Sequence, residues 1–154
     1  MADFIVRAIE RGDRAQWAPL WRAYLDYYRT AENPEATTTT WSRIFDPLEP
    51  VHGFVAARGD RLTGFAHYLF QRSTWLINAR CYLQDLYVSP DERSADVGRA
   101  LIAAVVAAAK EAGAANVFWN THETTRRRAA PLRRGGGAHG FHPVPYRSAE
   151  LRGC

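Results

Sequence analysis

Residues 82–102, Y-L-Q-D-L-Y-V-S-P-D-E-R-S-A-D-V-G-R-A-L-I, have the types and spacing best suited to chemistry. An apolar run ends at Val88, a short polar loop containing Arg93 follows, and helix-forming residues begin at Val97 and Gly98. A strand, a tight turn and the free backbone amides of a helix N-terminus can together bind a phosphate ester. The sequence therefore predicts a phosphate-bearing ligand at this turn.

Length and composition predict one globular domain. The chain has 154 residues, is 47% hydrophobic and contains five Trp, seven Tyr and seven Phe, enough to bury a core. It has no apolar run of about 18 residues and no signal-like N-terminus, so we expect no membrane partner and a cytoplasmic location. Cys81 lies in an apolar run and Cys154 ends the sequence, so the two cysteines form no disulfide framework.

The net charge of +4 is unevenly distributed. Residues 125–154 hold seven arginines and one acidic residue, Glu150, whereas residues 1–124 hold 13 basic and 15 acidic residues. The basic character therefore belongs to the C-terminal segment, and the charge of the whole chain does not indicate a nucleic-acid-binding domain.

Apolar periodicity predicts a mixed α/β domain with the order β-α-α-β-β-β-α-β. The expected elements are a strand at residues 4–6, a helix through residues 17–28, a helix carrying residues 41–45, strands at residues 51–57 and 62–70 joined by a turn at 59–60, a strand ending at residue 88, a helix from residue 97 and a strand at residues 117–119.

Several residues indicate where the expected helices begin and end. Asp13 is the expected N-cap of the first helix, with Gln16 completing a capping box, and Pro19 predicts either a kink or a start near residue 18. Residues 37–40, four threonines, suit a cap better than a helix interior. Gly113 is the expected C-cap of the helix that starts at Val97.

This element order, with this loop before the third helix, resembles the GCN5-related N-acetyltransferase (GNAT) family. The family signature Arg/Gln-x-x-Gly-x-Gly/Ala is matched by R-S-A-D-V-G at residues 93–98, followed by the family-typical R-A-L-I. The preceding Y-L-Q-D-L-Y-V is similar to the diamine acetyltransferase branch, where Y-L-E-D-hydrophobic-hydrophobic-V is usual. The resemblance covers residues 2–124. It implies a GNAT-like acyl-CoA N-acyltransferase fold and acetyl-CoA-dependent acetylation of a primary amine on a small, diamine-like molecule.

The resemblance also implies where acetyl-CoA binds. Its pyrophosphate would lie on the amides of residues 97–100, its pantetheine would pair like a strand with Leu86 and Val88, and an amide near Val88 would meet the oxyanion. A homodimer is the expected assembly in this family. The implied cofactor-binding residues are Leu86, Tyr87, Val88, Arg93, Val97, Gly98, Arg99 and Ala100.

The amine must lose a proton before it attacks, because alkyl amines have a pKa near 10. The candidate proton acceptors are Asp85, His122 and Glu123; for each, an ordinary structural role is the alternative. If residues alternate strictly along the strand, Gln84 and Asp85 face opposite sides and only one reaches the substrate. Gln84 stands where the resembling branch usually has Glu, and Gln cannot act as a base.

Aromatic residues of the first helix are the other candidates for substrate contact. Tyr24 and Tyr28 are expected beside the substrate with Gln84, and core packing with Trp17 and Trp21 is the alternative.

Two residues depart from the family signature. Ser94 and Asp96 stand where the family prefers Gly. A carboxylate at residue 96 would repel a pyrophosphate and would compete for the helix amides as an N-cap.

Residues 125–154 do not match the second family signature, Asn-x-x-Ala-x-x-Leu-Tyr, whose Tyr protonates the leaving thiolate. Pro131 and three consecutive glycines make a helix there unfavourable. Codons for residues 131–146, read from their second base, permit Leu-Tyr-Asp-x-Val-x-Glu-His-Thr-Gly-Phe-Ile-Gln-Tyr-Arg, which is close to the expected sequence. We therefore interpret residues 125–154 as out-of-frame sequence that leaves an acetyltransferase domain, residues 1–124, incomplete and its activity impaired.

Two alternatives remain open for this chain. One is a genuine Arg/Gly-rich tail that binds anions or nucleic acid. The other is a CoA-binding protein without turnover. If the family's last helix and strands are missing, residues 117–119 should form an exposed sheet edge.

Overall fold

The computed structural model of this chain describes residues 3–92, 96–120 and 143–146, the last by backbone alone. The described strands form one mixed sheet in the order β1-β2-β3-β4-β5-β6, which confirms the predicted fold class. Neighbours from β1 to β4 are antiparallel, and β4, β5 and β6 are parallel. The strands are β1 (Ile5–Ala8), β2 (Val51–Arg58), β3 (Arg61–Gln71), β4 (Arg80–Val88), β5 (Val117–Asn120) and β6 (Pro143–Tyr146).

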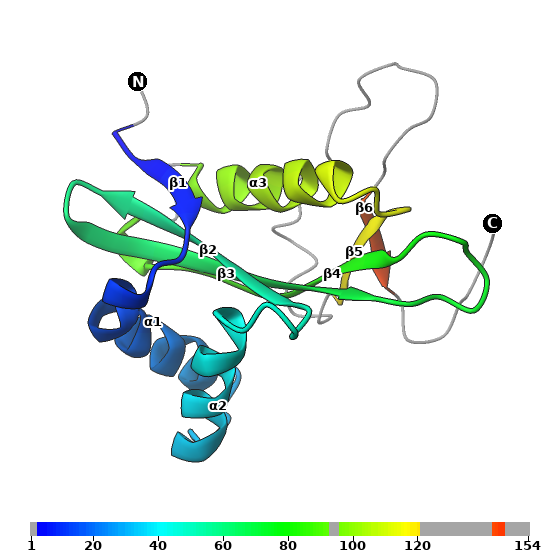
Figure 1. Cartoon of the computed structure of the whole chain (residues 1–154). Helices are drawn as coiled ribbons and strands as arrows, with labels where there is room; N and C mark the ends of the chain where they lie inside the picture. Colours follow the sequence, from blue (N-terminus) through cyan, green and yellow to red (C-terminus); the bar gives the residue numbers. More distant parts are fainter. Residues whose placement is uncertain (1–2, 93–95, 121–142, 147–154) are drawn as a thin grey trace.

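The helices cover both faces of the sheet. Helix α3 (Val97–Glu111) lies on one face, and α1 (Arg14–Tyr27) and α2 (Pro34–Ile44) lie on the other, as Figure 1 shows. Each face has its own core. Leu101 and Val105 of α3 are fully buried on one side of the sheet, and Trp17 of α1 and Phe65 of β3 are fully buried on the other. Two short 3₁₀ helices, η1 (Arg11–Asp13) and η2 (Pro90–Glu92), precede α1 and follow β4.

The predicted capping box of the first helix is wrong. Asp13 precedes α1 without capping it, because its carboxylate accepts two hydrogen bonds from Arg7, at 2.8 and 2.9 Å, and one from the Glu10 amide. The Arg7 guanidinium lowers the pKa of Asp13. Gln16 instead holds the β2–β3 hairpin: its Oε1 accepts from the Leu62 amide at 2.9 Å. The helix begins at Arg14, so Pro19 lies inside it.

The threonine run lies inside the second helix rather than at its cap. Asn33 caps α2, because its side chain accepts from the amides of Glu35 and Ala36 and Pro34 supplies the first helical residue. Thr37 then serves as an acceptor for the Trp21 indole at 3.1 Å, which links α2 to α1.

Strand β4 contains a bulge that changes which face its side chains occupy. His67 of β3 pairs with Asp85, but the next residue, Tyr68, pairs with Leu83, so Gln84 is an extra residue. Leu83 and Leu86 both pack in the core under α3. Strict alternation therefore fails here, and Asp85 reaches the α1 side although Leu83 does not.

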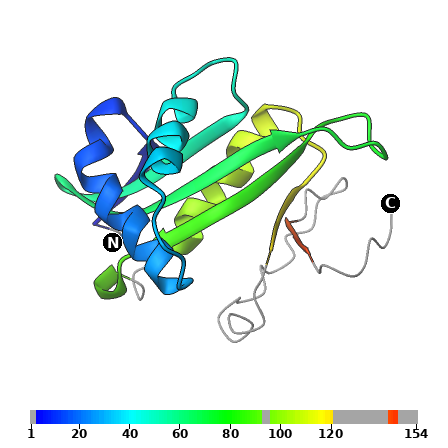
Figure 2. The same ribbon diagram turned by 90° about the horizontal axis from the view of Figure 1, so that it is seen from below.

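Strands β4 and β5 pair only where they begin. The register joins Cys81 to Val117 and Tyr82 to Phe118, and beyond this point the two strands diverge, as Figure 2 shows. Along residues 83–86, the outer edge of β4 has no strand partner among the described residues.

The other edge of β5 is covered. β6 pairs with it in parallel over four residues, so the expectation that residues 117–119 expose a sheet edge is wrong. In the described part of the chain, no helix is long and apolar enough to cross a membrane.

Candidate functional site

Asp85 is the centre of a buried chain of hydrogen bonds between β4, β3 and α1. The Tyr24 hydroxyl donates to Asp85 Oδ1 at 2.7 Å, and His67 Nδ1 lies 2.9 Å from Asp85 Oδ2. Beyond His67, the Trp17 indole Nε1 donates to His67 Nε2 at 3.1 Å. Trp17, His67 and Asp85 are 0%, 2% and 8% exposed, so water does not compete freely for these contacts.

The direction of these hydrogen bonds fixes the state of each group. An indole N–H can only donate, so His67 Nε2 must accept and carries no proton. The proton of the neutral ring is then on Nδ1, which donates to Asp85. Asp85 accepts from both sides, as a carboxylate does.

Tyr24 connects this series of hydrogen bonds to the protein surface. Burial and the neighbouring Asp85 raise the pKa of Tyr24, so the hydroxyl stays protonated and remains a donor at neutral pH. The Tyr24 ring packs edge-on against Tyr28 at 5.0 Å, and Tyr28 is 38% exposed. The structure therefore brings the predicted residues Asp85, Tyr24 and Tyr28 together, while Gln84 is exposed at the bulge.

Fewer backbone amides are available at the predicted phosphate-binding turn than the sequence suggested. Asp96 precedes α3 with a left-handed φ of 60° and makes no side-chain cap, so its carboxylate does not occupy the helix amides. The Ala100 amide already donates to the Asp96 carbonyl at 3.0 Å. The backbone amides of Val97, Gly98 and Arg99, at the first turn of α3, have no acceptor within the helix.

Among the described residues, no contact requires a glycine at position 98. Gly98 has no positive φ, and among the described residues an added Cβ would meet only Val88 Cγ2, at 3.6 Å. Gly64 is different, because a Cβ there would lie 2.7 Å from the Tyr87 carbonyl oxygen. Neither backbone conformation nor packing among the described residues therefore explains the glycine at position 98.

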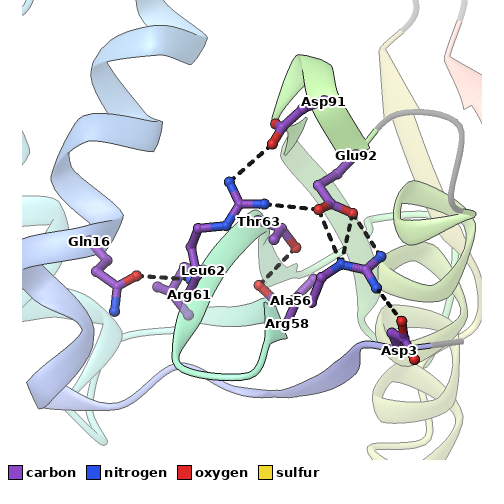
Figure 3. A network of polar contacts seen from close by, with 9 residues as sticks. All are labelled: Asp3, Gln16, Ala56, Arg58, Arg61, Leu62, Thr63, Asp91 and Glu92. Carbon is purple, nitrogen blue, oxygen red and sulfur yellow. Dashed lines mark hydrogen bonds and ion pairs between the residues drawn. The ribbon is translucent and has the colours of Figure 1, made fainter.

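An ion-pair network fixes the chain just before the phosphate turn (Figure 3). Glu92 of η2 is buried and accepts from Arg58 at 2.9 Å and from Arg61 at 2.9 Å. Arg61 also pairs with Asp91, and Arg58 with Asp3. The two arginines come from either side of the β2–β3 turn, so the network ties η2 to that hairpin.

Four of the predicted cofactor-binding residues have packed side chains. Leu86, Val88 and Val97 contribute to the core under α3, and Tyr87 is buried in the core under α1. Their contribution to a cofactor site would therefore come from the backbone. Arg99 is exposed on α3. The predicted residues Arg93, His122 and Glu123 lie outside the described residues.

Sequence reasoning missed His67 and gave Trp17 a packing role only. The available sign was a histidine within an apolar strand, since both ring nitrogens of a buried histidine need partners. Among the described residues, no group of three or more His, Cys, Asp or Glu side chains could hold a metal ion. Cys81 is a buried free thiol whose pKa is raised to about 12 by burial.

Comparison with known proteins supports the resemblance to the GNAT family that the sequence indicated. The acetyltransferase (GNAT) family matches residues 17–134. The D-amino-acid N-acetyltransferase HPA3 of Saccharomyces cerevisiae is 38% identical over 126 residues, covering 80% of this chain and 78% of that protein. The chain belongs to the GNAT family. This GNAT enzyme is accordingly an N-acetyltransferase.

Solved structures share the fold of this GNAT chain at low sequence identity. An aminoglycoside acetyltransferase, meta-AAC0020, from an uncultured soil sample and in complex with sisomicin, is 15% identical with a TM-score of 0.68, covering 92% of this chain and 96% of its own. Aminoglycoside N-acetyltransferase AAC(6')-Iy in complex with CoA is 17% identical with a TM-score of 0.69, covering 80% of each chain.

Proposed function

We propose that this enzyme transfers the acetyl group of acetyl-CoA to a primary amine of a small molecule, and that Asp85 receives the substrate's ammonium group. The observation that supports this most is the position of Asp85. It is held by Tyr24 and His67 on the strand whose outer edge, residues 83–86, has no strand partner among the described residues. A pantetheine chain pairing along that edge would bring its thioester close to this carboxylate.

The reaction requires one proton to leave the amine before a bond forms. The substrate ammonium gives its proton to the site, and the nitrogen lone pair then attacks the thioester carbonyl carbon. The C–N bond forms and the nitrogen loses a second proton, the C–S bond breaks, and the sulfur leaves with the electron pair and takes up a proton. Asp85 retains unused acceptor positions on both oxygens, so it can accept from an ammonium while keeping its two protein donors.

The amine class follows from charge and from the yeast relative. Gln84 replaces the carboxylate of the diamine branch, which removes one attraction for a second cationic group. The yeast relative is named for acetylating D-amino acids. We propose the amine of an amino-acid-like compound ahead of a diamine.

A thiol-release assay with acetyl-CoA and a panel of diamines, D- and L-amino acids and an aminoglycoside tests both statements. We expect amino acids to be acetylated faster than diamines. We expect Asp85→Asn to reduce kcat/KM by about 100-fold, the usual range for a lost acid–base group. Full activity of Asp85→Asn would contradict the role of Asp85. CoA binding without thiol release from any amine would contradict turnover.

We also propose that residues 125–154 are out-of-frame sequence and that the chain as written acetylates slowly. The family match ends at residue 134, and the Arg/Gly-rich segment supplies no counterpart of the signature tyrosine. The shifted frame of residues 131–146 would restore Leu-Tyr at the right place. A thiolate leaving without that acid must take its proton from water.

Sequencing the gene, and expressing a version with one base inserted near the codon of Thr125, tests the frame. The corrected protein should acetylate the same amines with a higher kcat. An early stop codon in the shifted frame would contradict the proposal. Salt-dependent nucleic-acid binding that disappears on truncation at Thr125 would instead support a genuine basic tail.

A further inference from the structure

Trp17 and His67 make hydrogen bonds that a purely packed core would not need. Trp17 is fully buried and packs at a tilt against Trp41 with ring centroids 4.8 Å apart, so its aromatic contacts alone would stabilise the core. Its indole nitrogen nevertheless points at His67, 3.1 Å away. A buried imidazole on β3 could have been any apolar residue if packing were its only task.

We infer that Trp17 holds His67 as the neutral Nδ1–H tautomer, and that His67 thereby positions the Asp85 carboxylate for the substrate amine. This inference rests on the proposed role of Asp85. His67 and Trp17 do not contact the substrate in this scheme; they are positioning residues that act through Asp85.

The physical basis is that His67 Nε2 cannot bind a proton while the indole donates to it. Protonation would set two N–H groups against each other, 3.1 Å apart and out of reach of water. His67 therefore stays uncharged beside Asp85. An imidazolium at this distance would lower the affinity of a carboxylate for a proton by about ten- to a thousandfold, which would weaken it as an acceptor.

The groups that surround His67 are consistent with a neutral imidazole ring. From β4 it faces Asp85, which also accepts from Tyr24 of α1, and Tyr28 packs against Tyr24. The ring contacts of His67 are with Trp17, Trp21 and Phe65, which do not ionise. Its cross-strand partner on β2 is Gly53, and α2 contributes Trp41 to the same core.

Trp17→Phe is the decisive variant, since it removes the indole donor and keeps an aromatic ring. Trp41→Phe is the matched control, because Trp41 lies in the same core and outside the hydrogen-bond chain. In Trp17→Phe no indole hydrogen points at His67 Nε2, so that nitrogen is free to bind a proton in acid. We expect kcat/KM of Trp17→Phe to be about tenfold below that of Trp41→Phe at pH 6 and equal to it at pH 9.

Nitrogen-15 NMR of the imidazole ring gives a second readout that does not depend on activity. In the unmodified chain His67 should show an unprotonated Nε2 from pH 5.5 to 9, and in Trp17→Phe that nitrogen should titrate. A pH-independent loss of activity in Trp17→Phe, or an Nε2–H tautomer in the unmodified chain, would overturn the inference. An unmodified chain that acetylates no amine would contradict the proposed function, and the NMR result would still decide the tautomer.

Discussion

The Asp96 carboxylate lies 3.6 Å from the Arg99 guanidinium, one turn into the helix that Asp96 precedes. Both side chains are largely exposed, so the pair contributes little to stability. Asp96 also holds a φ of 60°, a conformation that glycine adopts without strain and other residues adopt at a cost. The residue therefore places strain and negative charge beside the amides proposed to receive a pyrophosphate.

Asp96→Gly should bind acetyl-CoA more tightly than the unmodified chain. Removing the charge and the strained side chain favours a phosphate at the N-terminus of α3, and we expect a two- to tenfold lower Kd by calorimetry. Asp91→Asn is the control, because it removes a nearby exposed carboxylate that pairs with Arg61 instead. Unchanged or weaker binding by Asp96→Gly would contradict the position of the pyrophosphate.

Gly98→Ala should separate stability from binding. An added Cβ has room in the protein and alanine favours helix, so the free energy of unfolding should rise by up to about 1 kcal/mol. The same methyl group should obstruct a phosphate and weaken acetyl-CoA binding. Thermal unfolding and calorimetry on the same sample measure both. A stable Gly98→Ala protein with unaltered acetyl-CoA affinity would mean that no ligand approaches this residue.

Gly64→Ala, unlike Gly98→Ala, should lower the stability of the protein. Its Cβ would be 2.7 Å from the Tyr87 carbonyl oxygen and 3.3 Å from Leu101, so β3 and β4 must move apart. We expect a loss of about 1–3 kcal/mol in the free energy of unfolding, measured by urea denaturation. A change below about 0.5 kcal/mol would show that the sheet adjusts easily here.

Tyr24→Phe should reduce activity more than it reduces stability. The ring contacts remain, but Asp85 loses one of its two donors, and a hydrogen bond to a charged group contributes about 1.5–3 kcal/mol. We expect kcat/KM to fall about tenfold or more. Tyr68→Phe removes a buried hydroxyl from β3 on the α3 side of the sheet and should leave kcat/KM unchanged. Equal effects of the two variants would contradict a specific role for Tyr24.

Glu92 should contribute stability that acid removes. Arg58 and Arg61 lower the pKa of Glu92 below its ordinary value, so the folded state favours the carboxylate. The stabilisation is complete above the ordinary carboxyl pKa and is lost as the pH falls through the lowered pKa. The difference in Tm between the unmodified chain and Glu92→Gln should therefore be largest at pH 6–7 and should shrink in the acid range. A constant difference would mean that the network contributes nothing through charge.

The sequence predicted the order of elements, the hairpin turn and the end of α3, because these depend on periodicity and on glycines with positive φ. Gly59 and Gly113 have φ values of 58° and 74°. The sequence could not predict the partners of polar side chains. Asp13 and Gln16 fit a capping box locally, but tertiary partners, Arg7 and the Leu62 amide, use their side chains instead.

The candidate site was also only partly predictable, because the sequence does not show which distant side chains meet. Residue types identified Asp85, Tyr24 and the turn at Gly98. The link from Asp85 to Trp17 spans residues that are far apart in the sequence and depends on how α1 crosses β3. Acetyl-CoA binding, the homodimer and the cytoplasmic location stay predictions.

The single extra residue in β4 means that sequence spacing along this strand does not by itself give the face on which a side chain lies. Leu83 and Leu86 are separated by two residues rather than one, and both face α3. Removing Gln84 would leave Leu83, Asp85 and Leu86 in strict alternation, so the two leucines would stay under α3 and Asp85 would stay on the α1 side. In comparisons among relatives, a one-residue gap at this point is therefore compatible with the same faces for these three side chains.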